Sequence, residues 1–226
     1  MKLFFLIFLA CLTFYGCSSN TEKNLRKNTA ELREYLYEGS VDGVSASLIF
    51  GKREKNYIVN GYATELIEFG VVTFDVPEDI EIDETIAKYV VTIGTARYSG
   101  DLQKNPFEST LVADIKKSIS GVQNVTAKIV AGEFVKEIKL ACVNENWKIK
   151  SADVYSLVAK AFKNDFAKMI NNNSFAGEVY IKILNDPDEN ISDYYWYVCV
   201  IGRTGGRLSL IVSPKTGEIL AVNNLL

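Results

Sequence analysis

The sequence contains no histidine among its 226 residues. Histidine is the commonest general base and the commonest metal ligand in proteins, so a Ser-His-Asp or Cys-His catalytic site cannot be built from this chain alone. Chemistry that uses carboxylates or lysine remains open. The chain also lacks a basic surplus, because its formal net charge is −3. Proteins whose main partner is a nucleic acid carry such a surplus, so we expect no nucleic-acid partner.

Cysteine is scarce, and its distribution separates the start of the chain from the rest. Of the four cysteines, two lie within the first 17 residues, which leaves Cys142 and Cys199 for the body of the protein. Both lie in β-rich segments with alternating apolar residues. Two interpretations stay open: two buried thiols that act as small apolar side chains, or a disulfide, which an oxidising compartment would allow.

The first residues have the layout of a secretory signal. Lys2 supplies a positive charge, residues 3–12 are apolar without interruption, and the small Gly16 precedes Cys17. The apolar run is too short for a membrane-spanning helix, which needs about 20 apolar residues. We therefore predict a signal peptide over residues 1–17.

The sequence FYGCSSN at residues 14–20 resembles a bacterial lipoprotein signal. In that family the cysteine that follows a small residue is lipidated and becomes the new amino terminus. The resemblance implies lipidation of Cys17 and attachment to the membrane on the extracytoplasmic side of the cell envelope. Phe and Tyr stand before the glycine, where the family prefers Leu and a small residue. The alternatives are ordinary secretion with cleavage near Gly16, or lipidation of Cys11.

The next two predicted parts follow without a long linker. Residues 18–40 read as a polar tether and a helix, because the apolar residues within 25–37 fall near one stripe. Residues 41–150 read as a β-rich α+β domain built mostly of alternating strands. A helix is expected over 107–119, where Leu and Ile residues recur four positions apart.

The C-terminal part, residues 151–226, has the clearest pattern. Apolar residues keep the spacing of an amphipathic helix over 152–170. Four strand-like segments with turn residues between them follow, at 177–184, 193–201, 207–212 and 218–222. We therefore expect an α+β fold of antiparallel β-meanders with packed helices, which ends in a C-terminal α-β-β-β-β module.

Thr216-Gly217-Glu218, after the strand at 208–212, resembles the last turn of a PepSY-like module. Modules of that family place a helix before an antiparallel meander, and the resemblance covers about residues 151–222. The family occurs in secreted and envelope proteins, and its members are thought to bind or inhibit peptidases or to bind proteins in general. The resemblance implies a non-catalytic binding module and brings no catalytic residues.

Two motifs invite comparison with ligand sites. GRTGGR at residues 202–207 lacks the GK[ST] ending of a phosphate loop and joins strand to strand, so we expect a hairpin turn. Its two arginines, Arg203 and Arg207, remain candidate contacts for an anionic partner. The acidic run at 78–84 lacks the spacing and the glycine of an EF-hand loop. We expect solvated loop charges there, with no metal site and no cofactor.

The densest aromatic run is Tyr-Tyr-Trp-Tyr at residues 194–197. Alternate residues of a strand point to opposite faces, so Tyr194 and Trp196 share one face and the other two tyrosines share the second. The predicted helix over 152–170 can cover only one of these two faces. The other face is either an aromatic binding surface or part of the core. The candidate partner-binding residues are Tyr194, Trp196, Arg203 and Arg207.

Together these features favour a lipid-anchored bacterial envelope protein that binds another protein and has no catalytic centre. Modulation of a peptidase is the activity that the PepSY-like resemblance implies. One alternative is an envelope hydrolase that uses two carboxylates, although spacing nominates no such pair. The other is a structural or assembly lipoprotein whose sheet edges pair with neighbouring molecules.

Overall fold

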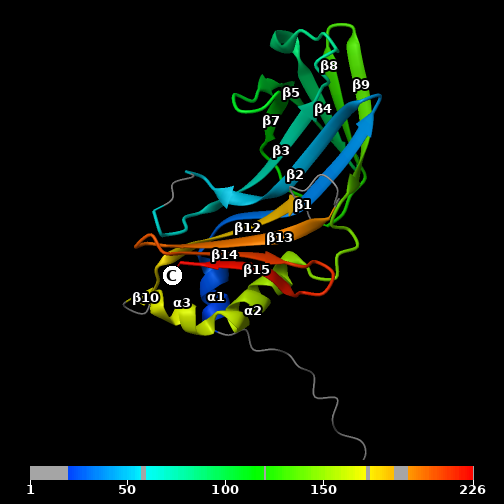
Figure 1. The fold of residues 1–226 in the computed structure, drawn as a ribbon. Coiled ribbons are helices and arrows are strands. Elements are labelled where there is room, and N and C mark those ends of the chain that lie inside the picture. Colours follow the sequence, from blue (N-terminus) through cyan, green and yellow to red (C-terminus); the bar gives the residue numbers. More distant parts are fainter. Residues whose placement is uncertain (1–19, 57–59, 120, 172–173, 186–192, 226) are drawn as a thin grey trace, which may run out of the picture.

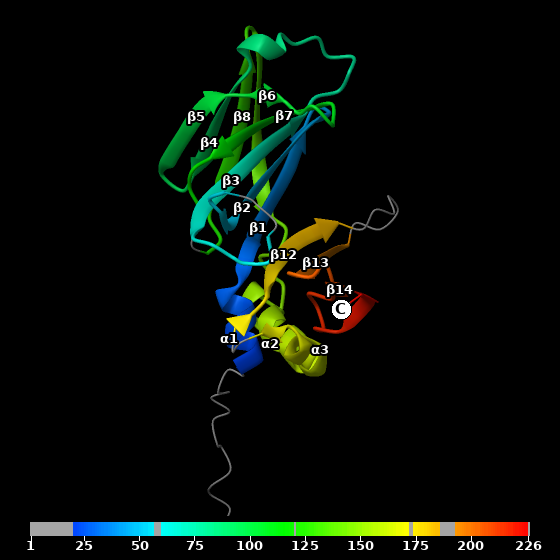
Figure 2. The same ribbon diagram turned by 90° about the vertical axis from the view of Figure 1, so that its left-hand side faces the viewer.

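The computed structural model describes residues 20–56, 60–119, 121–171, 174–185 and 193–225. Strands account for 54% and helices for 14% of the residues described. A 13-stranded sheet divides into a barrel-like part and an open C-terminal part (Figure 1). The helices lie together under the C-terminal part. They are at the opposite end of the molecule from the loops at the far end of the barrel (Figure 2).

Strand β1 (Thr29–Val41) joins the two parts of the sheet. Along one edge it pairs antiparallel with β2 (Val44–Glu54). Along the other edge, its first half pairs in parallel with β12 (Gly177–Asn185), and its second half pairs antiparallel with β9 (Phe134–Cys142). The same strand therefore contributes to the barrel and to the C-terminal sheet, and it makes the two parts one continuous sheet.

The barrel continues from β1 in both directions through antiparallel neighbours. One path runs through β2, β3 (Leu66–Asp75), β7 (Thr110–Ile115) and β6 (Gln103–Lys104). The other runs through β9, β8 (Val125–Ala131), β4 (Lys88–Ile93) and β5 (Ala96–Asp101), and the short 3-10 helix η1 (Glu84–Ile86) precedes β4. Alternation directs one side of each strand inward, where Leu48, Phe50 and Phe74 are fully buried. The barrel interior is thus a packed apolar core.

The C-terminal sheet is an antiparallel meander of β12, β13 (Tyr194–Gly202), β14 (Arg207–Val212) and β15 (Ile219–Asn224). One side is covered by α1 (Asn20–Lys27), α2 (Ser151–Ala161) and α3 (Lys163–Lys168). A second apolar core lies between, where Trp196 and Val198 of the sheet join Val154 and Phe166 of the helices. A small separate ladder pairs β10 (Ile170–Asn171) with β11 (Ser174–Phe175).

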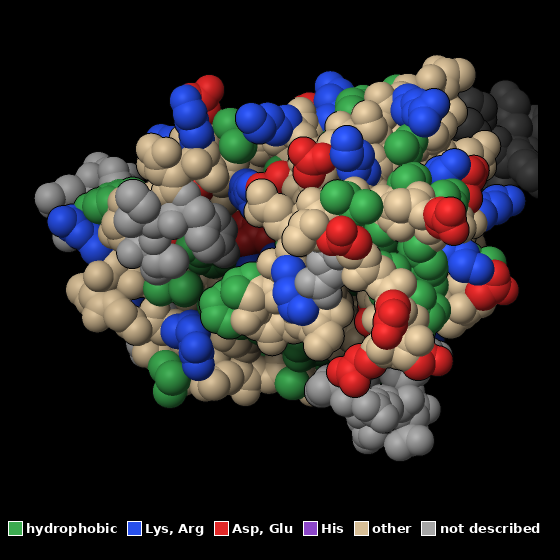
Figure 3. Space-filling view, turned by 90° about the horizontal axis from the view of Figure 1, so that it is seen from above, with side chains coloured by type: hydrophobic (Ala, Val, Ile, Leu, Met, Phe, Trp, Pro, Cys, Tyr) green, Lys and Arg blue, Asp and Glu red, His purple; other side chains and the backbone are tan. Residues whose placement is uncertain are grey.

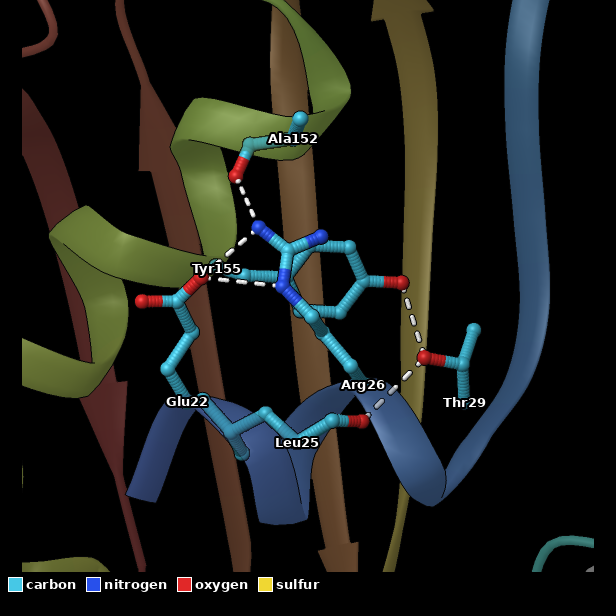
Figure 4. Close-up of polar contacts among 6 residues, drawn as sticks. All are labelled: Glu22, Leu25, Arg26, Thr29, Ala152 and Tyr155. Atoms are coloured by element: carbon cyan, nitrogen blue, oxygen red, sulfur yellow. Dashed lines mark hydrogen bonds and ion pairs between the residues drawn. The ribbon is translucent and has the colours of Figure 1, made fainter. Parts of the chain in front are cut away.

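Helix α1 is fixed on α2 by several polar contacts (Figure 4). Arg26 forms an ion pair with Glu22 at 2.8 Å, donates to the carbonyl of Ala152 at 2.7 Å and lies over the ring of Tyr155. Thr29 and the Tyr155 hydroxyl are hydrogen bonded at 2.7 Å, at the point where α1 passes into β1. The chain therefore enters the fold at the helix layer.

The expected α+β fold class is wrong, because the protein is mainly β with a nearly closed antiparallel barrel-like sheet. Two expected helices account for the difference. Of the helix expected over 25–37, only residues up to Lys27 are helical, and the residues from Thr29 on lie in β1. The segment 107–119 contains β7 instead of a helix. A spacing of four is an even number, so it suits one face of a strand as well as one face of a helix.

The strand predictions are confirmed in the C-terminal part, as is the expected position of the long helix, which is divided into α2 and α3 at Phe162. Cys142 and Cys199 are free thiols, of which Cys199 is buried. The predicted signal peptide, including Cys17, lies outside the described residues. Within the part of the chain that the structure describes, no helix has the length and apolar character needed to cross a membrane.

Candidate functional site

The side of β12, β13 and β14 that faces away from α2 and α3 is called the outer face here. Strand alternation sends Trp196 and Val198 into the helix-covered core, so the intervening side chains of β13 point to the outer face. Its members on the three strands are Tyr180, Lys182, Leu184, Tyr195, Tyr197, Cys199, Ile201, Arg207, Ser209 and Ile211. Tyr195 and Tyr197 are half-buried, and Leu184 is 38% exposed. Aromatic and aliphatic surface is therefore accessible on this face.

Trp196, one of the predicted binding residues, belongs to the core. Its side chain is 1% exposed and meets Trp147 edge-to-face with ring centroids 5.0 Å apart. The indole nitrogen donates to the carbonyl of Ile149 at 2.9 Å, which satisfies its polar atom. Trp196 thus supports the sheet and presents no surface to a partner.

Tyr194 lies on the same side of β13 and is half-buried against the helix-covered core. Its hydroxyl donates a hydrogen bond to the carboxylate of Glu38, on β1. Burial raises the pKa of Tyr194, and the hydrogen bond to Glu38 raises it further. Tyr194 therefore joins β13 to the barrel strand, and it does not belong to the outer face.

The two predicted arginines have different positions. Arg203 lies over the ring of Tyr62 at 4.8 Å and donates to its hydroxyl, so it contacts the loop between β2 and β3. Arg207 is exposed on β14 opposite Ile201 and belongs to the outer face. Gly205 has a φ of 91° in the turn between them, which confirms the expected hairpin.

Glu31 is the centre of an ionic cluster at the edge of the outer face. Its carboxylate forms ion pairs with Arg33 at 2.6 Å and with Lys182 at 2.9 Å, and its side chain is 3% exposed. Burial alone would raise the pKa of Glu31, but the charges and hydrogen bonds of Arg33 and Lys182 outweigh it and hold the pKa below its usual value. The pair of Glu31 and Lys182 also links β1 to β12 across their parallel junction.

A second buried carboxylate, that of Glu178, holds the loop between β2 and β3 against β12. One of its oxygens accepts the backbone N–H groups of Asn60, Gly61 and Tyr62 at 2.7, 2.6 and 3.2 Å. The other oxygen accepts the hydroxyl of Tyr180. Gly61 has a φ of 82°, and a side chain there would collide with Arg203. The loop backbone therefore forms an anion-binding nest, and the anion that it binds is the carboxylate of Glu178.

Tyr197 begins a short polar chain across the outer face. Its hydroxyl donates to Ser209 Oγ at 3.3 Å, and Ser209 in turn lies 3.7 Å from the sulfur of Cys199. Burial raises the pKa of Tyr197. The phenol is thus held in a defined orientation while part of its ring stays accessible, which suits a contact residue.

The outer face has the chemistry of a binding surface. It combines tyrosines and aliphatic residues with Lys182 and Arg207, while its buried acids are committed to hydrogen bonds and ion pairs. Among the described residues, no group of three acidic or cysteine side chains converges to hold a metal ion. Sequence reasoning missed Glu31 and Glu178. The sequence feature that could have identified them is an acidic residue within a strand rich in apolar residues.

A comparison of the chain with family models, curated proteins and solved structures found no match in any of the three.

Proposed function

We propose that this chain is a lipid-anchored bacterial envelope protein that binds another protein through the outer face of its C-terminal sheet. The observation that carries the proposal is that Tyr195, Tyr197 and Ile211 are part-exposed on the side of the sheet that the helices leave uncovered. Tyrosine offers a large, rigid contact area with a polar tip, which makes it frequent in protein interfaces.

The remaining composition of the outer face supports a protein ligand. Leu184 and Ile211 extend the apolar area at either side of the tyrosines. The exposed Arg207 supplies positive charge, whereas Lys182 is paired with Glu31. An apolar centre with polar and charged surroundings is the usual arrangement of a non-obligate interface. A partner with an apolar patch and acidic groups at its edge fits this pattern.

The lipid anchor is supported by the sequence pattern that ends at Cys17, directly before α1. Because α1 is fixed on α2, an anchor at Cys17 would leave the fold at the helix layer. The outer face looks away from that layer, so membrane attachment would leave it accessible. This arrangement also agrees with the resemblance of residues 151–222 to PepSY-like modules, which implies peptidase modulation as the effect of binding.

A hydrolase that uses two carboxylates is less well supported. Such enzymes need one carboxyl group with a raised pKa and a second carboxylate about 5–9.5 Å away, both open to a substrate. Glu31 has a lowered pKa and is enclosed by two cations, and Glu178 is saturated by backbone donors and Tyr180. Both acids of this region therefore act as structural acceptors.

The test compares complexes that the protein forms in its own membranes. Wild-type protein and a Tyr195→Ser/Ile211→Ser variant would be cross-linked in cells and purified, together with a matched Lys160→Ser/Asn164→Ser variant on the exposed side of the helices. We expect a discrete complex for the wild type and the helix variant, and its loss for the outer-face variant. The same complex in all three proteins would contradict the proposal.

A further inference from the structure

A phenylalanine at the barrel end of the molecule is almost fully exposed. Phe107 lies in the loop between β6 and β7 and is 92% exposed, whereas the aromatic residues of the barrel interior are buried. Its backbone N–H donates to the side chain of Asn105 at 3.1 Å, and the Asn105 N–H donates to the carbonyl of Thr110 at 2.8 Å. The fold thus holds the loop in place and makes no use of the phenyl ring.

An open pocket of about 730 Å³ lies beside this loop. Its lining includes Ser109, the last residue of the loop, Leu111 of β7, and a stretch of the β3–η1 connection. The apolar lining residues of that connection are Val76, Pro77, Ile80 and Ile82. Ile80 and Ile82 are partly buried against the barrel core, so the pocket has a supported apolar wall.

Acidic side chains surround this apolar area. Glu78, Glu81 and Asp83 line the same pocket, and Glu108 follows Phe107. The view from the barrel end shows acidic and hydrophobic side chains gathered side by side along one margin (Figure 3). We name the group formed by residues 76–78, 80–83, 107 and 108 the Phe107 surface.

The acidic character continues into a second concavity. A pocket of about 730 Å³ on the outside of β1, β2 and β3 is lined by Glu38, Asp75 and Glu108, together with hydroxyl groups such as those of Ser45 and Thr73. Glu108 therefore belongs to both regions. Lys104 is the one basic residue among the described residues that line either pocket.

We propose that the Phe107 surface docks a basic, extended segment of a partner protein, with Phe107 packing on an apolar side chain of that segment. This proposal does not depend on the outer face, which lies on the C-terminal sheet. Aromatic side chains are enriched among the residues that anchor protein interfaces, and Phe107 is exposed and available for such a contact. The acidic side chains favour a partner with positive charge, because opposite potentials on two surfaces favour their association.

The separation of the carboxylates on the Phe107 surface argues against a metal ion as its ligand, and their charge argues against a membrane. Within the described residues no three acids converge on one point, as a single cation would require, whereas a chain with several lysines or arginines meets separated carboxylates in turn. An anionic membrane would be repelled by the same charges. The hydroxyl groups of the second pocket are suited to hydrogen bonds with a peptide backbone.

The test measures fluorescence anisotropy of a labelled peptide of repeated Lys-Leu-Ser triplets with the full-length protein in a non-ionic detergent. A peptide with Glu in place of Lys is the probe control. We expect Phe107→Ser and Glu78→Gln/Glu81→Gln each to weaken binding roughly tenfold, and added salt to weaken it further. Val135→Ser and Glu145→Gln change exposed residues elsewhere, and both should bind as the wild type does.

Three outcomes would overturn the proposal. The first is no preference for the Lys peptide over the Glu peptide. The second is equal weakening by Glu145→Gln and Glu78→Gln/Glu81→Gln, with none by Phe107→Ser, which would show attraction by net charge alone. The third is binding to phosphatidylglycerol vesicles that Phe107→Ser abolishes, which would indicate a membrane contact. Unchanged thermal unfolding of Phe107→Ser confirms that the loss concerns binding.

Discussion

The carboxylate of Glu178 accepts the backbone N–H of Gly61 at 2.6 Å and thereby ties the loop after β2 to strand β12. This contact joins the barrel to the C-terminal sheet at a second place besides the pairing of β1. Because Glu178 is fully buried, the backbone donors of this loop replace the hydrogen bonds that its carboxylate would form with water. The other oxygen of Glu178 accepts the hydroxyl of Tyr180, so the same carboxylate also orients a residue of the outer face.

Glu178→Gln should destabilise the protein by about 1–3 kcal/mol, because the neutral amide forms weaker hydrogen bonds and buries an NH2 group against backbone donors. The free energy of unfolding in urea measures the loss. Glu145→Gln, at an exposed position, is the control and should stay within about 0.5 kcal/mol of the wild type. Equal stability of the two variants would show that the loop contact is unimportant.

Glu31 predicts a specific sensitivity to acid. Its pKa in the folded protein lies below the ordinary value of 4.5, so the unfolded chain binds the proton more readily. The stability that Glu31 contributes is therefore present at neutral pH and is lost as the pH falls through the folded-state pKa. Urea unfolding followed from pH 7 downwards should show a shallower decline in Glu31→Gln than in the wild type. Parallel declines would contradict the assignment.

Trp196 and its neighbour Tyr195 should respond very differently to truncation. Trp196→Ala removes a fully buried side chain and should cost about 3–5 kcal/mol of unfolding free energy. Tyr195→Ala removes a part-exposed ring and should cost about 1 kcal/mol or less. Chemical unfolding of both variants tests which side of β13 is covered, and similar losses would place both rings in the core.

The proposed lipid anchor predicts that replacing the Cys17 side chain changes the location of the protein. Cys17→Ala should move the protein from the membrane fraction to the soluble fraction, since alanine offers no thiol for acylation. Cys11→Ala is the matched control and should leave the protein with the membranes. Membrane attachment that survives Cys17→Ala would reject lipidation at this residue.

The strands could be predicted from the sequence because alternation of apolar residues is a local signal. The helices could not be separated from strands where apolar residues recur every four positions, as at Leu111 and Ile115. At β1 the environment decides: Leu32 and Leu36 both pack against the second apolar core, in a strand that has neighbours on both edges and a register shift between Arg33 and Tyr35. Such long-range pairing overrides a local helical pattern.

The candidate site was predictable only in part. Alternation correctly assigned Tyr195 and Tyr197 to the opposite face from Trp196, but it does not say which face the helices cover. The expectation that named Tyr194 and Trp196 therefore selected the covered side. The partners of Glu31 and Glu178 come from distant strands and loops, so no local pattern identifies Lys182 or Gly61 as their contacts.

The most direct test of the proposed binding role is photo-cross-linking from single positions. A benzophenone amino acid would replace Tyr195 on the outer face, and in a matched experiment Lys160 on the exposed side of α2. Irradiation of living cells should give a discrete adduct with one partner protein from position 195 and none from position 160. The account would be contradicted by an adduct from position 160 alone, or by the same adducts from both positions.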